Sequence, residues 1–493
     1  MNYKMFVHNQ SLSLLTDLYQ LTMAYGYWRN TIDRKVAVFH LSFRNNPFRG
    51  GFALACGLDY AIDFLENFKL DKTDTAYLAS LKGNDQRPLF DREFLDYLDS
   101  LKFECDMDAI PEGTIVFPHE PLLRIKGPLI QCQILETALL NIINFQTLIA
   151  TKAARMCIAS RGDPVLEFGL RRAQGIDGAL AASRAAYIGG CEATSNILAG
   201  KIFGIPVRGT HAHSWVMSFD DELESFLAYA KSLPNNCVFL VDTYDTLEGV
   251  KKAVAAGRWL RSQGHEMIGI RLDSGDLAYL SKEARKILDQ NGFPKAVIIA
   301  SNELDENIIH SLKEQGAQTN VWGVGTKLVT GYDQPALGGV YKLSAIQDSN
   351  GEWKYKVKLS EQSIKVSNPG IQQVRRYFSP TESIADVIYD ERSDLSSGCI
   401  MIDPLDTTRQ KRIPQETVYQ DLLVPIFRGG KKVYKVPTIE ETKKNARENL
   451  LKFHSGIKRF VNPHQYPVGL EKSLHALKMK LILQAREKKN NQI

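Results

Sequence analysis

The 493-residue sequence lacks the features that mark several protein classes. It has seven cysteines, an odd number, and no two of them are spaced as Cys-x-x-Cys. This argues against a disulfide framework and a structural zinc site, and it favours reduced thiols in the cytoplasm. Residues 1–10 lack the long apolar region of a signal peptide. No uninterrupted apolar run of about 18 residues occurs, so we expect a soluble chain without a membrane span.

A strong charge imbalance is also missing. Lysine and arginine number 61 against 56 aspartates and glutamates, a net charge of +5. This excess is small for the length and the basic residues are spread widely, so a nucleic-acid-binding surface is not predicted. A mild positive excess still suits an anionic substrate. No internal repeat or long low-complexity segment is present, and the length suggests about three domains at roughly 150 residues each.

The pattern of apolar residues divides the chain into residues 1–133, 134–338 and 339–493. The first segment is expected to be mixed α/β. Its predicted helices cover residues 11–28, 58–68 and 91–101, and its predicted strands cover 36–43 and 114–125. A long, largely buried helix over residues 134–156 opens the second segment.

From about residue 160, short apolar runs alternate with helix-like stretches. The runs are Val165–Phe168, Val207–Gly209, Val238–Val241, Ile268–Leu272, Ala296–Ala300 and Val321–Val324. Strands that alternate with helices predict parallel βα units, and right-handed crossovers place all the strand C-terminal ends on one face. In a β/α barrel, that face carries the chemistry.

After Gly338 this rhythm ends. Val340–Ile346 and Trp353–Leu359 flank Asp348-Ser349-Asn350-Gly351, which predicts a hairpin that rejoins the N-terminal domain. The remainder is expected to be irregular as far as two basic helices over residues 439–452 and 470–489. We interpret these basic helices as solvated faces rather than as nucleic-acid or membrane patches.

Polar residues follow the apolar runs of the second segment, where each predicted strand ends. Loops are polar in any protein, but six such sets at the same place in successive units indicate a site. The sets are Glu167-Phe168-Gly169-Leu170-Arg171-Arg172, Gly209-Thr210-His211-Ala212-His213-Ser214, Asp242-Thr243-Tyr244-Asp245-Thr246, Arg271-Leu272-Asp273-Ser274-Gly275-Asp276, Ser301-Asn302-Glu303-Leu304-Asp305 and Gly323-Val324-Gly325-Thr326.

Each set has a functional and a structural interpretation. The turn at residues 323–326 offers unshielded N–H groups to a phosphate, or it is simply a tight βα turn. Asp242, Asp273 and Asp276 provide hard oxygens for Mg²⁺ or ribose hydroxyls, or they cap helices.

The remaining candidates are arginines, an aromatic ring and two histidines. Arg171 and Arg271 each provide a planar fork for a carboxylate or phosphate, or they pair with a nearby acid. Phe168 belongs to the core or stacks on a planar ring. His211 and His213 would face the same side of an extended backbone. They are candidates for a base, a phosphate acceptor or, less plausibly, zinc ligands, and His211 is equally a buried structural histidine. Together these groups suit a phosphorylated sugar with a good leaving group and a flat anionic acceptor.

In the same residues, the sequence closely resembles the nicotinate phosphoribosyltransferases over most of its length. The segments that carry the resemblance are Leu15–Met23, Phe43-Arg44 through Pro47-Phe48, Phe52-Ala53, Phe168–Arg172, Gly209-Thr210 with Ala212–Ser214, Arg271–Asp276, Gly323–Thr326 and Pro369-Gly370. Each motif is weak alone, but their joint occurrence in this order is highly specific.

The resemblance implies a type II phosphoribosyltransferase fold, an irregular α/β barrel beside a mixed α/β sandwich domain formed by the N-terminal and post-barrel segments. It implies the reaction of nicotinate, 5-phosphoribosyl 1-diphosphate and ATP to nicotinate mononucleotide, diphosphate, ADP and phosphate, with Mg²⁺. It also implies a homodimer.

The resemblance further assigns roles to individual residues. His213 would be the phosphorylated histidine, and Asp273 and Arg271 would join it in catalysis. Asp273 would also bind the metal. Nicotinate would be bound by Tyr19, supplied across the dimer interface, and by Phe168, Arg171 and Thr210. Phosphoribosyl diphosphate would be bound by Arg271, Ser274, Gly275, Gly323, Gly325, Thr326 and Asp242.

Four other interpretations remain open at this stage. A nicotinamide phosphoribosyltransferase would have an acid in the segment Ala193–Leu198, which has none, so a carboxylate substrate is favoured. A quinolinate enzyme would be much shorter. A sugar-phosphate aldolase or isomerase on a barrel would use Lys327 as its Schiff-base residue. An inactive, partner-binding relative would need none of the polar sets.

Overall fold

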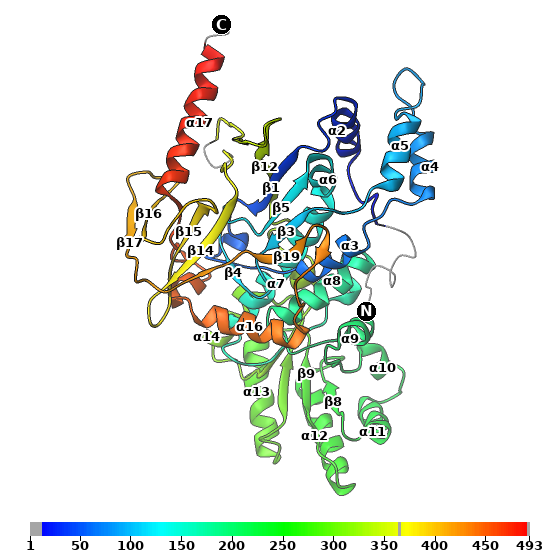
Figure 1. Cartoon of the computed structure of the whole chain (residues 1–493). Coiled ribbons are helices and arrows are strands. Elements are labelled where there is room, and N and C mark those ends of the chain that lie inside the picture. Colours follow the sequence, from blue (N-terminus) through cyan, green and yellow to red (C-terminus); the bar gives the residue numbers. More distant parts are fainter. Residues whose placement is uncertain (1–11, 363–365, 491–493) are drawn as a thin grey trace. The chain divides into compact units, whose positions relative to one another are not determined.

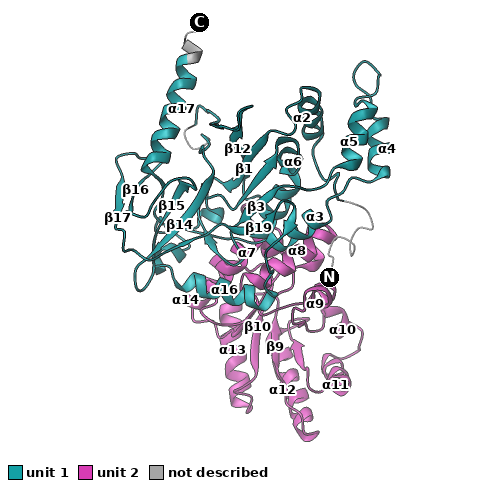
Figure 2. Ribbon diagram, in the orientation of Figure 1, with its two compact units in different colours: residues 1–148, 336–493 teal, residues 149–335 magenta. Residues whose placement is uncertain are grey.

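The computed structural model describes residues 12–362 and 366–490, which divide into two units. Unit 1 contains the described residues up to 148 and from 336 onward, and unit 2 contains residues 149–335 (Figure 2). The sequence placed the first boundary at residue 134. In the structure, the division falls within the long helix α7 (Glu136–Ala159), which contributes to both units.

The first sheet of unit 1 contains strands from both segments of the chain that form this unit (Figure 1). Its strand order is β13-β12-β1-β5-β3-β19-β20. The strands are β1 Val36–Phe43, β3 Asp106–Ala109, β5 Leu123–Pro128, β12 Gly339–Gln347, β13 Trp353–Tyr355, β19 Val424–Arg428 and β20 Lys431–Lys432. Strand β1 lies antiparallel between β5 and β12, and β12 forms the predicted hairpin with β13. Residues 37–41 of β1 are all buried, as expected for a central strand covered on both faces.

A second sheet corrects the expectation that the segment after the hairpin is irregular. Its order is β17-β16-β21-β15-β14-β18. The strands are β14 Gln372–Phe378, β15 Ser383–Asp390, β16 Cys399–Ile402, β17 Gln410–Ile413, β18 Tyr419–Asp421 and β21 Val468–Glu471. The edge strands β17 and β18 are short and largely exposed, so their sequences carry no apolar run from which to predict them.

The helices predicted for unit 1 are present, but the first begins later than predicted, and the helices Lys72–Ser80 and Leu129–Ile134 were not predicted. The helices are α2 Leu18–Arg29, α3 Leu58–Glu66, α4 Lys72–Ser80, α5 Arg92–Ser100, α6 Leu129–Ile134, α16 Ile439–Leu451 and α17 Lys472–Asn490. Helix α2 was predicted from Ser11, which lies outside the described residues. It begins at Leu18, because Asp17 caps it and donates its N–H to Gln20 Oε1 at 3.2 Å.

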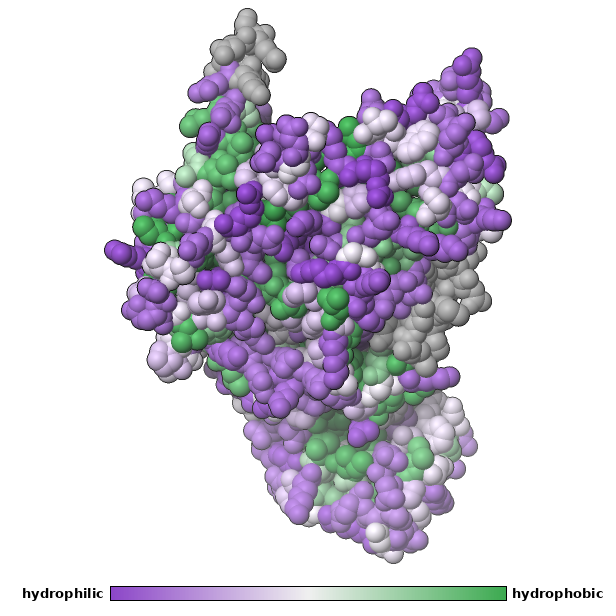
Figure 3. All heavy atoms as spheres, viewed as in Figure 1, coloured by the Kyte–Doolittle hydropathy of each residue, from purple (hydrophilic) through white to green (hydrophobic). Residues whose placement is uncertain are grey.

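The C-terminal helix α17 is not solvated all round. It buries Leu474 and Ile482 but leaves Met479 and Leu483 exposed, so apolar side chains lie among hydrophilic ones along it (Figure 3). Among the described residues, no helix is both long and apolar enough to cross a membrane.

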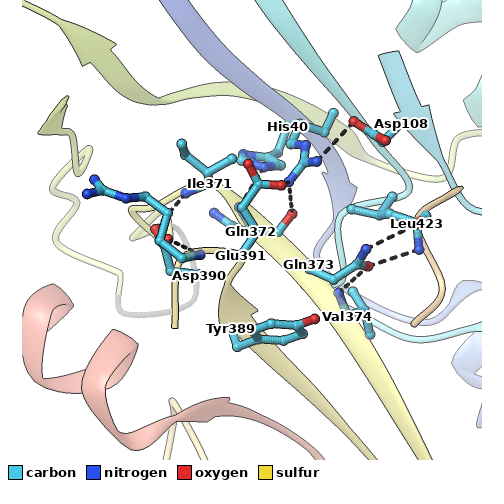
Figure 4. A network of polar contacts seen from close by, with 12 residues as sticks. His40, Asp108, Ile371, Gln372, Gln373, Val374, Tyr389, Asp390, Glu391 and Leu423 are labelled. Carbon is cyan, nitrogen blue, oxygen red and sulfur yellow. Dashed lines mark hydrogen bonds and ion pairs between the residues drawn. The ribbon is translucent and has the colours of Figure 1, made fainter. Parts of the chain in front are cut away.

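A buried polar network connects the two sheets of unit 1 (Figure 4). Arg124 of β5 donates to Asp108 Oδ2 at 2.9 Å and to the Gln372 carbonyl at 3.1 Å, and it pairs with Glu391 at 2.7 Å. Gln372 in turn donates its backbone N–H to His40 Nε2 at 3.1 Å. Because all of these groups except Glu391 are buried, the hydrogen bonds between them offset the cost of removing them from water.

Arg376 provides a stability prediction in the second sheet. Its side chain is 2% exposed, and its Nε donates to Asp386 Oδ1 at 2.9 Å, which also accepts from the Tyr466 hydroxyl. Arg376→Ala leaves the fully buried Asp386 carboxylate without its cation. We expect it to lower the free energy of unfolding by about 3–5 kcal/mol in chemical denaturation. Arg409→Ala removes an exposed pair with Asp406 and should change it by less than about 1 kcal/mol. Equal effects would contradict the assignment.

Unit 2 is built on a parallel six-stranded sheet in the order β7-β6-β11-β10-β9-β8. The strands are β6 Val165–Glu167, β7 Ala193–Thr194, β8 Val238–Leu240, β9 Gly269–Leu272, β10 Val297–Ala300 and β11 Val321–Val324. Five of the six predicted strands are confirmed. The sixth, Val207–Gly209, is wrong, because only an isolated bridge between Val207 and Thr194 forms there and β7 takes the strand position. No pairing joins β7 to β8 in the described part of the chain, so the sheet is open between them.

The helices of unit 2 alternate with the strands, except that three helices lie in succession between β7 and β8. The helices are α8 Gly175–Ile188, α9 Ile197–Phe203, α10 His213–Met217, α11 Glu222–Ser232, α12 Thr246–Ser262, α13 Leu277–Gln290, α14 Glu306–Glu314 and α15 Thr326–Val329. Asp245, Asp276 and Asp305 cap α12, α13 and α14 with their carboxylates. The capping interpretation of Asp276 is thus confirmed, since its Oδ1 accepts from the N–H groups of Ala278 and Tyr279 at 3.0 Å each.

Candidate active site

Arg271, near the end of β9, is the centre of a polar cluster in unit 2. Its Nε donates to Ser301 Oγ at 2.8 Å, Nη1 to Thr210 Oγ1 at 3.0 Å and Nη2 to Asp273 Oδ1 at 2.9 Å. Asp273 and Ser301 lie on loops that follow β9 and β10, and Thr210 lies in the segment between α9 and α10. The guanidinium has five N–H donors and three are engaged, which leaves two for a ligand in a fixed orientation.

Asp273 connects Arg271 to the histidine loop. Its Oδ1 accepts from Arg271 and from the Ser301 hydroxyl, and its Oδ2 lies 3.8 Å from His213 Nε2. Burial raises the pKa of Asp273, but the hydrogen bond from Ser301 and the charge of Arg271 outweigh it and hold the pKa below its usual value. The carboxylate is therefore ionised at neutral pH and suited to face a cation.

Asp242 supports the loop after β9. Its Oδ2 accepts from the backbone N–H of Asp273 and from the Ser274 hydroxyl, at 2.7 Å each. Its Oδ1 is buried and has no hydrogen-bond partner among the described residues. In that part of the chain, no group of three or more histidines, cysteines or acids is arranged to hold a metal ion. Two carboxylates that share a cation with ligand phosphates are nevertheless the usual protein contribution to a Mg²⁺ site, so Asp242 and Asp273 fit one.

The two histidines occupy different environments. His213 begins α10, its side chain is 39% exposed, and its Nδ1 lies 3.1 Å from Thr243 Oγ1. His211 is only 8% exposed, and its Nε2 accepts the N–H of Leu240 at 3.2 Å. His213 is therefore accessible to a ligand, whereas His211 is buried within unit 2.

An aromatic ring and an exposed guanidinium lie after β6. The Arg271 guanidinium carbon is 5.9 Å from the centre of the half-buried Phe168 ring. A side chain at Gly323 would meet that ring, because a Cβ there would lie 2.8 Å from two of its carbons. Arg171 lies in the short helical turn Leu170–Arg172, where it is exposed. This loop thus combines a ring surface with a guanidinium suited to bind a carboxylate.

Glu167 fixes the loop that carries Phe168 through three hydrogen bonds. This buried carboxylate accepts from the Ser183 hydroxyl at 2.9 Å, the Thr194 hydroxyl at 2.6 Å and the backbone N–H of Gly169. Thr194 belongs to the segment Ala193–Leu198, where a nicotinamide phosphoribosyltransferase would have an acid. The structure uses that segment to fix the loop.

The remaining predicted residues lie on neighbouring loops or in the other unit. Gly325 and Thr326 form the turn into α15, and Gly275 has φ +76°, a conformation that favours glycine. Lys327, the Schiff-base candidate, donates to Asp305 Oδ2 at 2.7 Å. Burial lowers its pKa, but the bond and charge of Asp305 outweigh this and raise the pKa, the opposite of what an amine nucleophile needs. Tyr19 lies on α2 of unit 1 and is 47% exposed.

Sequence reasoning did not single out two residues that the cluster depends on. Ser301 bridges Arg271 and Asp273, and Thr243 contacts His213. Ser301 directly follows β10 and Thr243 lies three residues beyond β8, so both positions were included in the polar sets. Their partners were not, because those partners lie on other loops.

Comparisons with known proteins identify the family of the chain. Three family models match the chain: the nicotinate phosphoribosyltransferase (NAPRTase) N-terminal domain over residues 14–144, the NAPRTase family over 165–376 and the NAPRTase C-terminal domain over 371–478. The nicotinate phosphoribosyltransferase of Bacillus subtilis is 44% identical over 97% of both chains. That of Dictyostelium discoideum is 38% identical over 94% of this chain and 86% of its own. The crystal structure of human nicotinic acid phosphoribosyltransferase aligns with a TM-score of 0.82 at 32% identity, covering 95% of this chain and all of that one.

Proposed function

The chain belongs to the nicotinate phosphoribosyltransferase family and is an enzyme of NAD biosynthesis, and from this premise we propose that the Arg271 cluster is its active site. The reaction joins the nicotinate nitrogen to the anomeric carbon of phosphoribosyl diphosphate and releases diphosphate. The observation that carries the assignment is the single network through which Arg271 holds Thr210, Asp273 and Ser301 together.

Nicotinate is assigned to the loop after β6. The exposed Arg171 guanidinium pairs with its carboxylate, and Phe168 offers a ring face for the pyridine. Thr210 borders the same place through its bond to Arg271. Displacement at the anomeric carbon passes through a cation-like state, so holding the pyridine nitrogen at that carbon is the main contribution of these residues.

The phosphates are assigned to the neighbouring loops. Gly323, Gly325 and Thr326 would receive the 5′-phosphate through backbone N–H groups, and Ser274, Gly275 and Asp242 would border the ribose and diphosphate. Asp273 and Asp242 are the residues that would hold Mg²⁺, which when bound neutralises charge on the diphosphate leaving group. The two free N–H groups of Arg271 would stabilise the same developing charge.

ATP coupling is assigned to His213. The γ-phosphoryl group of ATP moves to an imidazole nitrogen of His213 and releases ADP, and water later cleaves the phosphorus–nitrogen bond to give phosphate. The ionised Asp273 carboxylate beside Nε2 stabilises the positive charge that the ring gains in this step. The strand arrangement of unit 2 fits an irregular barrel, open between β7 and β8.

A homodimer in which Tyr19 reaches the partner's pyridine site completes the proposal. Its support is an exposed apolar stripe at the start of unit 1, formed by Leu15, Leu18, Tyr19 and Met23. We expect Leu18→Glu to convert a dimer into a monomer in light scattering and to raise the KM for nicotinate. Tyr77→Glu changes an exposed aromatic on α4 outside the stripe and serves as the control. A dimer that survives Leu18→Glu with normal kinetics would refute this role of the stripe.

The direct test of function is product detection. The enzyme is incubated with phosphoribosyl diphosphate and either nicotinate, nicotinamide or quinolinate, with and without ATP. Formation of nicotinate mononucleotide with stimulation by ATP supports the proposal. Faster turnover of nicotinamide or quinolinate would overturn it, and so would borohydride trapping of a sugar phosphate on Lys327.

A further inference from the structure

The outer edge of β8 is hydrogen-bonded to a side chain instead of to another strand. Within the described residues, β8 pairs only with β9, so β8 is the last strand of its sheet. The N–H of Leu240 would be an unpaired donor on that edge, and burial of such a group without a partner costs free energy. It donates instead to His211 Nε2 at 3.2 Å.

The segment that carries His211 is attached to the opposite edge of the same sheet. Its preceding residues pair with β7, where Thr194 donates its N–H to the Pro206 carbonyl at 3.0 Å and accepts from the Arg208 N–H at 3.0 Å. His211 then bonds to β8. Residues 206–211 therefore span the opening between β7 and β8 with backbone bonds on one side and an imidazole on the other.

The ring of His211 is enclosed by apolar neighbours. Its centre lies 5.0 Å from that of Tyr229 and 6.2 Å from that of Phe226, both on α11. Burial lowers the pKa of His211 to about 4, with Arg271 adding to the effect, while the backbone carbonyl of Ala212 opposes it. The ring is neutral at physiological pH, which leaves Nε2 free to accept.

We propose that His211 is a positioning residue that fixes the Thr210–His213 loop to β8 and so sets the position of the phosphate-accepting histidine. Thr210 is bonded to Arg271, and His213 contacts Thr243, which lies just beyond the end of β8. His211 lies between these two contacts. Without its bond, the loop keeps its attachment to β7 but loses its attachment to the backbone of β8.

The inference rests on the proposed role of His213, so its test has one structural and one kinetic measurement. His211→Phe keeps a ring of similar size and removes the acceptor. His211→Gln returns an acceptor oxygen at a similar reach. Phe226→Leu is the matched control, because it disturbs the same packing and leaves the Leu240 bond in place. All variants are compared as full-length enzymes.

The structural measurement is amide hydrogen exchange of peptides that cover residues 206–217 and 238–243. Exchange should accelerate in both segments for His211→Phe, return towards the wild-type rate for His211→Gln and remain slow in β8 for Phe226→Leu. Unchanged exchange at β8 in His211→Phe would overturn the anchoring role, whatever the enzyme's activity.

The kinetic measurement is the stimulation of nicotinate mononucleotide formation by ATP. A displacement of His213 by about 1 Å is enough to reduce this stimulation on the order of 10- to 100-fold in His211→Phe. His211→Gln should recover most of it, and Phe226→Leu should retain it at equal thermal stability. Equal losses in His211→Phe and Phe226→Leu would reduce His211 to a packing residue. If the wild-type enzyme itself shows no stimulation by ATP, the proposed coupling fails, while hydrogen exchange still decides the anchoring role.

Discussion

Replacing Arg271 with alanine should lower kcat/KM on the order of 100-fold or more, as for the loss of an electrostatic transition-state donor in other enzymes. The substitution removes the two unengaged N–H donors and also the three bonds that hold Thr210, Asp273 and Ser301 in one arrangement. Steady-state kinetics with saturating phosphoribosyl diphosphate measures the effect.

Two further variants separate charge from geometry at this position. Arg271→Lys keeps the positive charge but cannot bond to three loops at once, so it should remain well below wild type. Arg261→Ala removes an exposed arginine of α12, paired with Glu266, and should leave the kinetics unchanged. An effect of less than about threefold for Arg271→Ala would show that Arg271 makes no contact that strengthens in the transition state.

Replacing His213 with alanine should abolish the stimulation by ATP and spare part of the ATP-independent turnover. The imidazole is the only group assigned to accept the phosphoryl group, whereas the residues proposed to position the two substrates, Arg271, Asp273 and Phe168, are unchanged. Product formation and ADP release are measured in parallel, and protein labelled from γ-phosphate-labelled ATP is assayed for an acid-labile phosphate.

His265 is the control for this experiment. It lies in the same unit, is partly exposed, and its Nδ1 lies 2.8 Å from Asn235 Oδ1, so His265→Ala should keep both labelling and stimulation. Normal ATP coupling in His213→Ala would refute the assignment of the phosphohistidine. Complete loss of turnover with and without ATP would mean that His213 acts in the transfer step itself.

Local sequence patterns were sufficient to predict most strands of the parallel sheet in unit 2. Five strands of unit 2 were predicted because each is a short buried apolar run that ends in a polar loop. Parallel connection then brings those loops to one edge of the sheet. The juxtaposition of Arg271, Asp273 and Ser301 could thus be anticipated from strand ends alone. The position of His213 could not, because no strand forms in the segment that precedes it.

The features that could not be predicted from the sequence depend on contacts between residues far apart in the chain. The exposed edge strands β17 and β18 have no apolar run, and β7 is only two residues long. The residue pattern left His211 open as a functional or a buried structural histidine, because its bonding partner, the amide of Leu240, is 29 residues away. The sequence predicted that Gly323 binds a phosphate, but it did not show that a Cβ at this position would meet the Phe168 ring.

The most direct measurement is a crystal structure of the enzyme with nicotinate mononucleotide bound. The account predicts the pyridine ring against Phe168, its carboxylate on Arg171, the ribose beside Arg271 and Asp273, and the phosphate at Gly325–Thr326. A nucleotide seated elsewhere, with Arg271 and His213 turned away from it, would contradict the claim that these loops form one active site.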